Sequence, residues 1–346
     1  MDRFPVLQGS SATMYPSAPV RRQSRRHLDK VIGLSLVVAL IAWRSPAPSA
    51  RADNRTTAGF SIAFEDEVSA YRDTSVFVMP NAPLQIRVIG GPSGEYSIKT
   101  DGGQLTRRGP RRWQWAAAAQ PGLFKLEVRS PAGTDTITLR AFVMVPAAAV
   151  KDGYLNGYRI GTYPDQPSNG NPLYRAPRGF IEVTKQNQDT RVSPHFRLRQ
   201  FLCKQEPVAH FPKYVVLEER LILNLENILE QVGARGFDAD TLHVMSGYRT
   251  PYYNSALGDV RYSMHQFGGA ADIFVDRHDR GVMDDLTRDG RVDLQDARYL
   301  HDLIDVMLMR PLFSKFEGGM GFYPATRAHP PFVHVDIRGN RARWRG

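Results

Sequence analysis

The fold and chemistry of the C-terminal half are indicated by the stretch Ser263-Met264-His265-Gln266-Phe267-Gly268-Gly269-Ala270-Ala271-Asp272. It places an imidazole, His265, six intervening residues before a carboxylate, Asp272. The residues leading into the carboxylate, Gly268 to Ala271, are all small. Small residues let a backbone approach a bound group closely, so this stretch is a candidate for holding a ligand between His265 and Asp272.

Two further segments extend this pattern in both directions. Ser246-Gly247-Tyr248-Arg249-Thr250-Pro251 precedes it, and Phe332-Val333-His334-Val335-Asp336 lies far downstream. Two imidazoles and one carboxylate are a sufficient protein shell for a catalytic zinc ion, because a tetrahedral ion held this way keeps a fourth position for water. A structural zinc site would usually recruit cysteines, but Cys203 is the only cysteine. The set predicts a hydrolytic site; the alternative is ordinary core or surface contacts.

The segments together resemble the D-Ala-D-Ala carboxypeptidase (VanY-type) zinc peptidases, which cut bacterial cell-wall peptides. The resemblance rests on Ser263-x-His265-x-x-Gly268-x-Ala270-x-Asp272, Ser246-Gly247-Tyr248-Arg249 and His334, and it covers roughly residues 193–346. It implies that His265, Asp272 and His334 bind zinc. It also implies that Arg249 binds the carboxylate or oxyanion of the substrate, with a plain ion-pair role as the alternative.

The end of the chain is similar to a murein endopeptidase branch of the same group. The residues that carry this likeness are Gly321-Phe322-Tyr323-Pro324, Phe332-Val333-His334-Val335-Asp336 and Arg343-Trp344. The resemblance implies hydrolysis of stem-peptide crosslinks in peptidoglycan. The alternatives are a D,D-carboxypeptidase, a non-catalytic zinc-containing protein that binds the cell wall, and a metalloprotease acting on proteins.

One position departs from the family pattern. Many relatives place a general-base glutamate three residues before the last histidine ligand, where this sequence has Pro331. Asp336 is the first substitute, because residues two apart in a strand share a face and a carboxylate beside His334 could take a proton from zinc-bound water. His329 and then Glu317 are the competitors. Asp336 could instead orient His334 or Arg249.

A second cation site is expected between the two halves of the zinc motif, in residues 284–296. Oxygen-bearing side chains at positions 1, 3, 5, 9 and 12, with Gly290 at position 6, match a calcium loop of the EF-hand or dockerin type. Position 7 would offer its carbonyl. The candidate ligands are Asp285, Thr287, Asp289, Arg291, Asp293 and Asp296. The alternative is an acidic surface turn without metal.

Length and composition set the frame for these motifs. At 346 residues with 42% hydrophobic residues, the chain is long enough for two globular domains after a targeting segment. The formal charge is +10, but residues 1–52 hold eight Lys/Arg and two Asp/Glu, which leaves +4 for the rest. No basic stripe interleaved with aromatic residues accompanies that small surplus. We therefore expect no nucleic-acid partner, although an acidic polymer remains compatible.

The N-terminus has the order of a secretory signal peptide over residues 1–52. A basic region from Arg21 is followed by an apolar run, Val31 to Trp43, and by small residues at Ala50 and Ala52. Thirteen apolar residues form a helix of about 20 Å, too short for a hydrocarbon core of about 30 Å. We expect export to the periplasm or cell envelope, with a membrane anchor only if the signal stays uncleaved. Ser24-Arg25-Arg26 resembles a twin-arginine motif.

The remaining chain changes its periodicity along its length. Residues 53–147 show alternation, in 84–88, 124–129 and 136–141, that predicts a small all-β, sandwich-like domain with Trp113 and Trp115 in its core. Residues 148–192 are rich in Gly, Pro, Asn and Tyr and are expected to form a linker or an ordered strap. Residues 193–346 are expected to be an α+β domain, with a helix starting at Ser193-Pro194 and a second one over Leu217 to Val232.

Overall fold

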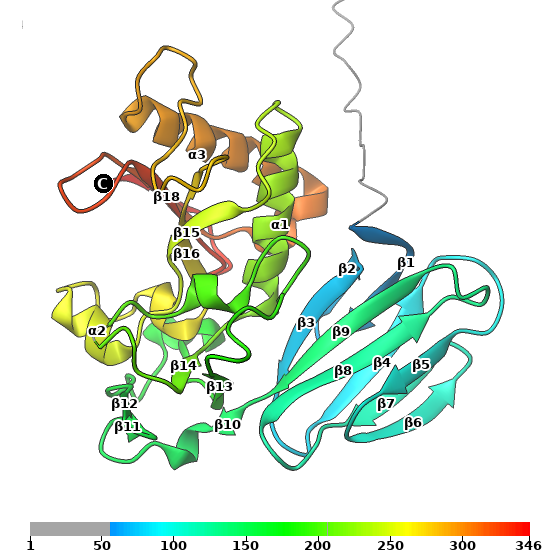
Figure 1. Cartoon of the computed structure of the whole chain (residues 1–346). Helices are drawn as coiled ribbons and strands as arrows, with labels where there is room; N and C mark the ends of the chain where they lie inside the picture. The colour runs from blue at the N-terminus through cyan, green and yellow to red at the C-terminus, as the bar shows by residue number, and fades with distance from the viewer. Residues whose placement is uncertain (1–55, 206) are drawn as a thin grey trace, which may run out of the picture. The chain divides into compact units, whose positions relative to one another are not determined.

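The computed structural model describes residues 56–205 and 207–346 (Figure 1). The predicted signal peptide, residues 1–52, lies outside the described residues. Within the described part of the chain, no helix is both long and apolar enough to cross a bilayer.

Residues 57–143 form two sheets whose apolar side chains share one core. The first sheet has the order β2-β1-β4-β7-β6 and is antiparallel; the second has the order β3-β9-β8-β5, with β3 and β9 parallel. Trp115 is fully buried and Trp113 is nearly so. The strands are β1 (Thr57–Phe64), β2 (Glu67–Tyr71), β3 (Asp73–Val78), β4 (Pro83–Ile89), β5 (Ser97–Thr100), β6 (Gln104–Gly109), β7 (Arg112–Ala116), β8 (Gly122–Arg129) and β9 (Thr136–Val143).

The segment predicted as a linker or strap is an ordered part of the second hydrophobic core. Its apolar side chains, among them Tyr158, Phe180 and Val183, are buried together with those of the C-terminal half. The sheet β10-β13-β14 joins this segment to Val145–Pro146 on one side and to Lys213–Val215 on the other. Its elements are β10 (Val145–Pro146), β11 (Tyr154–Leu155), β12 (Tyr158–Arg159), β13 (Gly179–Val183), β14 (Lys213–Val215), and the 3-10 turns η1 (Ala147–Ala149), η2 (Ser168–Gly170) and η3 (Pro172–Tyr174).

The C-terminal half is built on the sheet β15-β16-β18-β17-β19. All neighbours are antiparallel except β17 and β19. Helix α3 packs against β17 and β18, and α1 packs against α3 (Figure 1). Every residue of β16 and β18 is buried. The elements are η4 (Leu198–Phe201), α1 (Glu219–Gly233), β15 (Leu242–Ser246), α2 (Pro251–Ala256), η5 (Met264–Phe267), β16 (Ala270–Val275), α3 (Leu294–Leu308), η6 (Pro311–Phe316), β17 (Gly319–Tyr323), β18 (Phe332–Asp336) and β19 (Ala342–Arg345).

The two helix predictions had different outcomes. The apolar residues from Leu221 to Val232 form the buried face of α1, which begins at Glu219 rather than at Leu217 and ends at Gly233. The predicted helix start at Ser193-Pro194 is wrong. The amide of Val192 donates to the carbonyl of Phe196, and the amide of His195 donates to the Glu226 carboxylate 2.9 Å away. These bonds hold the segment in an irregular turn, because they use donors and acceptors that a helix would need.

Candidate metal centre

Strand pairing brings two of the three predicted zinc ligands together. β16 and β18 are antiparallel, and in their register Asp272 lies directly opposite His334. Directly opposed residues of a pair project from the same face of a sheet. The two side chains therefore meet on one face, although 62 residues separate them in sequence.

The third ligand comes from the turn that enters β16. η5 carries His265 and ends at Gly268, whose φ of +72° is left-handed. A Cβ atom there would lie 2.6 Å from the backbone of Val216. Only glycine combines that conformation with that close approach. Gly268 therefore lets the turn fold back so that His265 reaches Asp272.

The three donor atoms form a compact triangle in the described structure. His265 Nε2 is 3.2 Å from His334 Nδ1 and 3.2 Å from Asp272 Oδ1, and His334 Nδ1 is 2.9 Å from Asp272 Oδ1. Ligands about 2.0–2.1 Å from a tetrahedral zinc ion stand about 3.3 Å apart. The triangle is thus close to the size that zinc requires, and among the described residues no other His, Cys, Asp or Glu joins this group.

Neighbouring acceptors hold both imidazoles in the tautomer that a metal needs. His265 Nδ1 lies 2.7 Å from the carbonyl oxygen of Gly247, and His334 Nε2 lies 3.1 Å from Asp336 Oδ2. When each ring is neutral, the nitrogen that donates to these acceptors carries the hydrogen, which leaves the lone pairs of His265 Nε2 and His334 Nδ1 for a metal ion. Such outer partners are the usual means of orienting histidine ligands, and the residues present fit a zinc ion.

Burial and charge act on these groups in opposite directions. Burial lowers the pKa of His265. Burial also disfavours the charged form of His334, but hydrogen bonds to Asp272 and Asp336 outweigh it and raise the pKa of His334 to about 9. Although burial alone would raise the pKa of Asp272, the two histidines keep that pKa well below its usual range. The carboxylate is therefore ionised, as a zinc ligand must be.

Arg249 is an ion-pair partner of a ligand in this structure. Its Nη2 bonds to Oδ2 of Asp272, its Nη1 donates to Asp259 over 2.7 Å, and its Nε donates to Ser246 Oγ over 2.8 Å. The side chain is 14% exposed. Arg249 thus pairs with carboxylates of the protein itself, and the substrate-binding role that the resemblance implies stays a prediction. Asp259 was not singled out by the sequence, because it belongs to no spacing pattern.

Asp336 is enclosed by partners. Its Oδ1 accepts from the Gly319 amide (2.8 Å) and from the amide and Nε of Arg338 (3.0 and 2.9 Å). Its Oδ2 faces His334 Nε2 and also accepts from the Arg338 guanidinium. Burial tends to raise the pKa of Asp336, but hydrogen bonds from His334 and Arg338 lower it strongly. The side chain has no exposed surface, so water has no access to the carboxylate.

The other two candidate bases lie in different surroundings. His329 is half-buried, its ring packs edge-on against Phe332, and its Nδ1 donates to the Pro330 carbonyl over 2.9 Å. Its Nε2 has no hydrogen-bond partner among the described residues. Glu317 is paired with Arg343 over 2.8 Å.

A tryptophan from the C-terminal strand covers one side of His334. The rings of Trp344 and His334 lie 5.4 Å apart, and Trp344 Nε1 donates to the hydroxyl of Tyr323 over 2.6 Å. β19 reaches this place because Gly321 leaves room: a Cβ there would lie 2.2 Å from Trp344 Nε1. In the sequence, Trp344 is notable only as part of the C-terminal segment that resembles the endopeptidase branch. The structure shows that its ring packs beside His334 of the proposed metal centre.

A second group of potential ligands was missed by the sequence. His243, Asp276 and Asp279 offer donor atoms within 4.8 Å of one another. The sequence gives no signal for His243, because no potential ligand stands at ligand spacing near it. Both oxygens of Asp276 already accept backbone amides, from His278 (3.3 Å) and Gly281 (2.7 Å). This engagement makes the group a weaker candidate than the first.

The predicted calcium loop has no support in the structure. Asp285 accepts the amides of Arg288, Asp289 and Gly290, and buried Asp296 accepts those of Leu286, Thr287 and Asp293. Asp293 caps α3. Among the described residues, none of these carboxylates belongs to a group that could hold a metal ion. In this structure the carboxylates close a turn and start a helix.

Comparison with known proteins bears on the same half of the chain. Residues 194–302 match the model of the Peptidase M15 family. This M15 match includes His265 and Asp272 and ends before His334, and it spans less than a third of the chain. It supports a metallopeptidase of the M15 family, whose members depend on zinc, in agreement with the resemblance to VanY-type peptidases.

Two other comparisons add no function. None of the curated proteins matches the chain. Among solved structures, "Chimeric titin Z1Z2 functionalized with a KLER exogenous peptide from decorin" matches at 20% identity, over 24% of this chain and 93% of its own, with a TM-score of 0.16. A score this low carries no argument about fold or function.

Proposed function

We propose that the chain is a zinc-dependent peptidase of the bacterial cell wall that hydrolyses stem-peptide crosslinks of peptidoglycan as a murein endopeptidase. The observation that carries this proposal is the triangle of His265, Asp272 and His334 donor atoms, 2.9 to 3.2 Å apart. The M15 match supports metallopeptidase chemistry, and the C-terminal segment Phe332 to Asp336 supports the endopeptidase branch.

In this proposal the protein's own groups organise the metal centre. When bound, zinc would polarise the scissile carbonyl and lower the pKa of a coordinated water. Gly247 and Asp336 fix the two imidazoles, and Arg249 holds Oδ2 of Asp272 so that Oδ1 faces the histidines. Fixed ligands need no rearrangement as charge develops in the reaction, which is how a preorganised site lowers a barrier.

We assign Asp336 the orienting role and His329 the role of proton acceptor. Asp336 directs its lone pairs to His334, Arg338 and Gly319, and a general base must be within reach of the water it deprotonates. His329 Nε2 has no hydrogen-bond partner in the described part of the chain, and its ring packs against Phe332. Phe332 shares a sheet face with His334, because the two are two residues apart in β18.

The test uses zinc-loaded protein and defined crosslinked muropeptides, with the products identified by mass spectrometry. We expect crosslinked dimers to be converted to monomers, with no turnover after chelation and recovery on adding zinc. Release of free D-alanine without loss of crosslinks would indicate a D,D-carboxypeptidase instead. His329→Gln should keep its zinc and lose about 100-fold in kcat; unchanged kcat would remove His329 as the acceptor.

A non-catalytic zinc protein that binds the cell wall is the second candidate. It is favoured by one observation, that Pro331 stands where relatives carry the general-base glutamate while Asp336 is fully engaged. The same muropeptide experiment separates the two functions. Tight binding without any cleavage by zinc-loaded protein would support this candidate and refute the peptidase.

We propose that the protein works outside the cytoplasm, in the periplasm or cell envelope. The proposal rests on the order of basic, apolar and small residues between Arg21 and Ala52, and it matches a substrate that lies outside the inner membrane. Fractionation of cells that express the full chain, with N-terminal sequencing of the exported form, tests it. Recovery of the intact chain in the cytoplasm alone would contradict it.

A further inference from the structure

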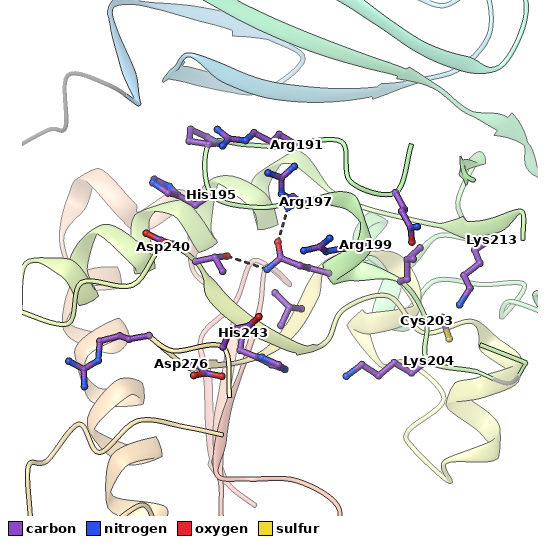
Figure 2. A pocket seen from close by; sticks show the side chains of 18 of the residues that line it. Arg191, His195, Arg197, Arg199, Cys203, Lys204, Lys213, Asp240, His243 and Asp276 are labelled. Atoms are coloured by element: carbon purple, nitrogen blue, oxygen red, sulfur yellow. Dashed lines mark hydrogen bonds between the residues drawn. The ribbon is translucent and has the colours of Figure 1, made fainter. Parts of the chain in front are cut away.

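A cationic groove lies along β15, the strand that pairs with β16 of the proposed metal centre. It has a volume of about 1360 Å³ and is lined by the loops around residues 191–213, the start of β15 and the turn that follows β16 (Figure 2). Six cationic side chains face three aspartates, Asp240, Asp276 and Asp279. The cations are Arg191, Arg197, Arg199, Lys204, Lys213 and Arg277. A concave surface with an excess of one charge concentrates ligands of the opposite charge, so the groove favours an anion.

Strand register connects this groove to the metal centre. His243, which lines the groove, pairs with Phe274, and their rings stack 4.4 Å apart. Phe274 lies two residues beyond Asp272 in β16 and shares its face of the sheet, a spacing of about 7 Å. An extended peptide also advances about 7 Å per two residues. The groove wall at His243 therefore stands along the sheet from Asp272 by about the distance that separates a peptide residue from the second residue after it.

Several cations of the groove are already engaged. Arg277 pairs with Asp284 over 2.9 Å, Arg199 pairs with the Asp189 carboxylate, and Arg197 donates to the Asp189 carbonyl over 2.6 Å. Their charges are partly neutralised by groups of the protein. They contribute to the field of the groove more than to any single contact.

Lys204 differs from them. It is exposed within the groove lining and makes no ion pair or hydrogen bond with a described residue. Figure 2 shows its side chain extending toward His243. The groove walls lower the pKa of Lys204 by desolvation, while Asp272 acts on its charge in the opposite direction. An accessible ammonium group thus lines the groove and interacts electrostatically with Asp272.

We propose that this groove is the subsite for an acidic segment of the substrate peptide, and that Lys204 binds the carboxylate nearest to the metal centre. The inference rests on the proposed peptidase function and adds a substrate class to it: peptides with free carboxylates about two residues from the cleaved bond. Lys204 is exposed and makes no ion pair or hydrogen bond with a described residue, so an anionic ligand would supply its partner.

A binding experiment tests the groove without requiring turnover. Capped tri-glutamate and capped tri-glutamine peptides are titrated into the full-length zinc-loaded protein and into Lys204→Gln. We expect the wild type to prefer tri-glutamate, with Lys204→Gln binding it about tenfold more weakly and tri-glutamine equally. Lys185→Gln, which removes an exposed lysine outside the groove lining, should bind as the wild type does. Equal affinity of the wild type for both peptides would overturn the inference.

A kinetic experiment places the groove in the reaction. For crosslinked muropeptides with free carboxylates, Lys204→Gln should raise KM about tenfold and leave kcat and zinc content unchanged. For the same muropeptides with carboxamides, both proteins should have equal KM. Hydrolysis with no such charge dependence would refute the groove and leave the peptidase standing. Selective tri-glutamate binding without any hydrolysis would support the groove and refute the peptidase.

Discussion

Replacing Asp336 by asparagine separates two roles for this carboxylate. In the structure Asp336 accepts from His334 Nε2 through Oδ2 and from the Gly319 amide through Oδ1. An asparagine keeps the shape but has one acceptor oxygen and one NH2 donor. The new NH2 group must then face either the N–H of His334 or the amides of Gly319 and Arg338, and in both cases two donors meet. We expect His334 to lose its fixed orientation while the chain still folds.

The expected magnitude follows from the bond that is removed. A hydrogen bond to a charged group contributes about 1.5–3 kcal/mol, and each 1.4 kcal/mol is about tenfold in an equilibrium constant. Zinc affinity should therefore fall about 10- to 100-fold, the range typical when an outer partner of a ligand is lost. At saturating zinc the hydrolysis rate should return to near that of the wild type.

The assay is a zinc titration against a competing chelator, followed by muropeptide hydrolysis over the same range of zinc concentrations. Asp305→Asn is the matched control, because Asp305, like Asp336, accepts from arginine (here Arg341 and Arg343) but contacts no predicted metal ligand. If Asp336 were the base, Asp336→Asn would bind zinc normally and lose about 10²- to 10⁴-fold in kcat at every zinc concentration. That result would refute the orienting role.

Three further predictions concern other parts of the C-terminal half. His265→Ala should reduce bound zinc from about one ion per chain to background and abolish hydrolysis, and retained zinc, measured by elemental analysis, would contradict the ligand assignment. Glu226→Gln should cost about 1.5–3 kcal/mol of unfolding free energy below pH 6.5. Because Glu226 raises the pKa of His195, this difference should shrink as the pH rises through that pKa; chemical denaturation giving the same difference at pH 5.5 and 9.5 would count against it. Gly321→Ala should displace Trp344 from His334, cost about 1–3 kcal/mol and change the tryptophan emission, whereas unchanged emission and stability would show that the strands adjust without strain.

Where burial follows a local period, the sequence alone predicted the secondary structure and its buried face. The alternation at 84–88, 124–129 and 136–141 falls within β4, β8 and β9, whose side chains alternate between the core and solvent or half-buried positions. The stripe from Leu221 to Val232 is the buried face of α1. In both cases each residue's environment is set by its own element, so a pattern of period 2 or 3.6 is visible without knowing the partner.

Features set by distant contacts could not be predicted in this way. Ser193-Pro194 has the local signature of a helix start, but Glu226 and Phe196 take the hydrogen bonds that a helix would need. The role of Asp336 depends on Gly319, on the neighbouring strand, and on Arg338. Lys204 is a candidate ligand-binding residue only because the pairing of β15 with β16 places His243 opposite Phe274, two residues after Asp272. No spacing pattern in the sequence predicts these contacts between distant residues.

The register of the core strands connects the metal centre to the stability of the fold. Asp272 opposes His334 in the β16–β18 pair, and a slip of one residue would turn His334 to the opposite face of the sheet. Both strands are buried throughout, so such a slip would also expose or misplace their apolar residues. Hydrophobic burial therefore fixes the ligand geometry, and Gly247 and Asp336 fix the tautomers. A site held by the fold itself binds zinc without having to fold around it, so zinc should stabilise the native state by mass action, with an unfolding free energy that rises with the logarithm of its concentration.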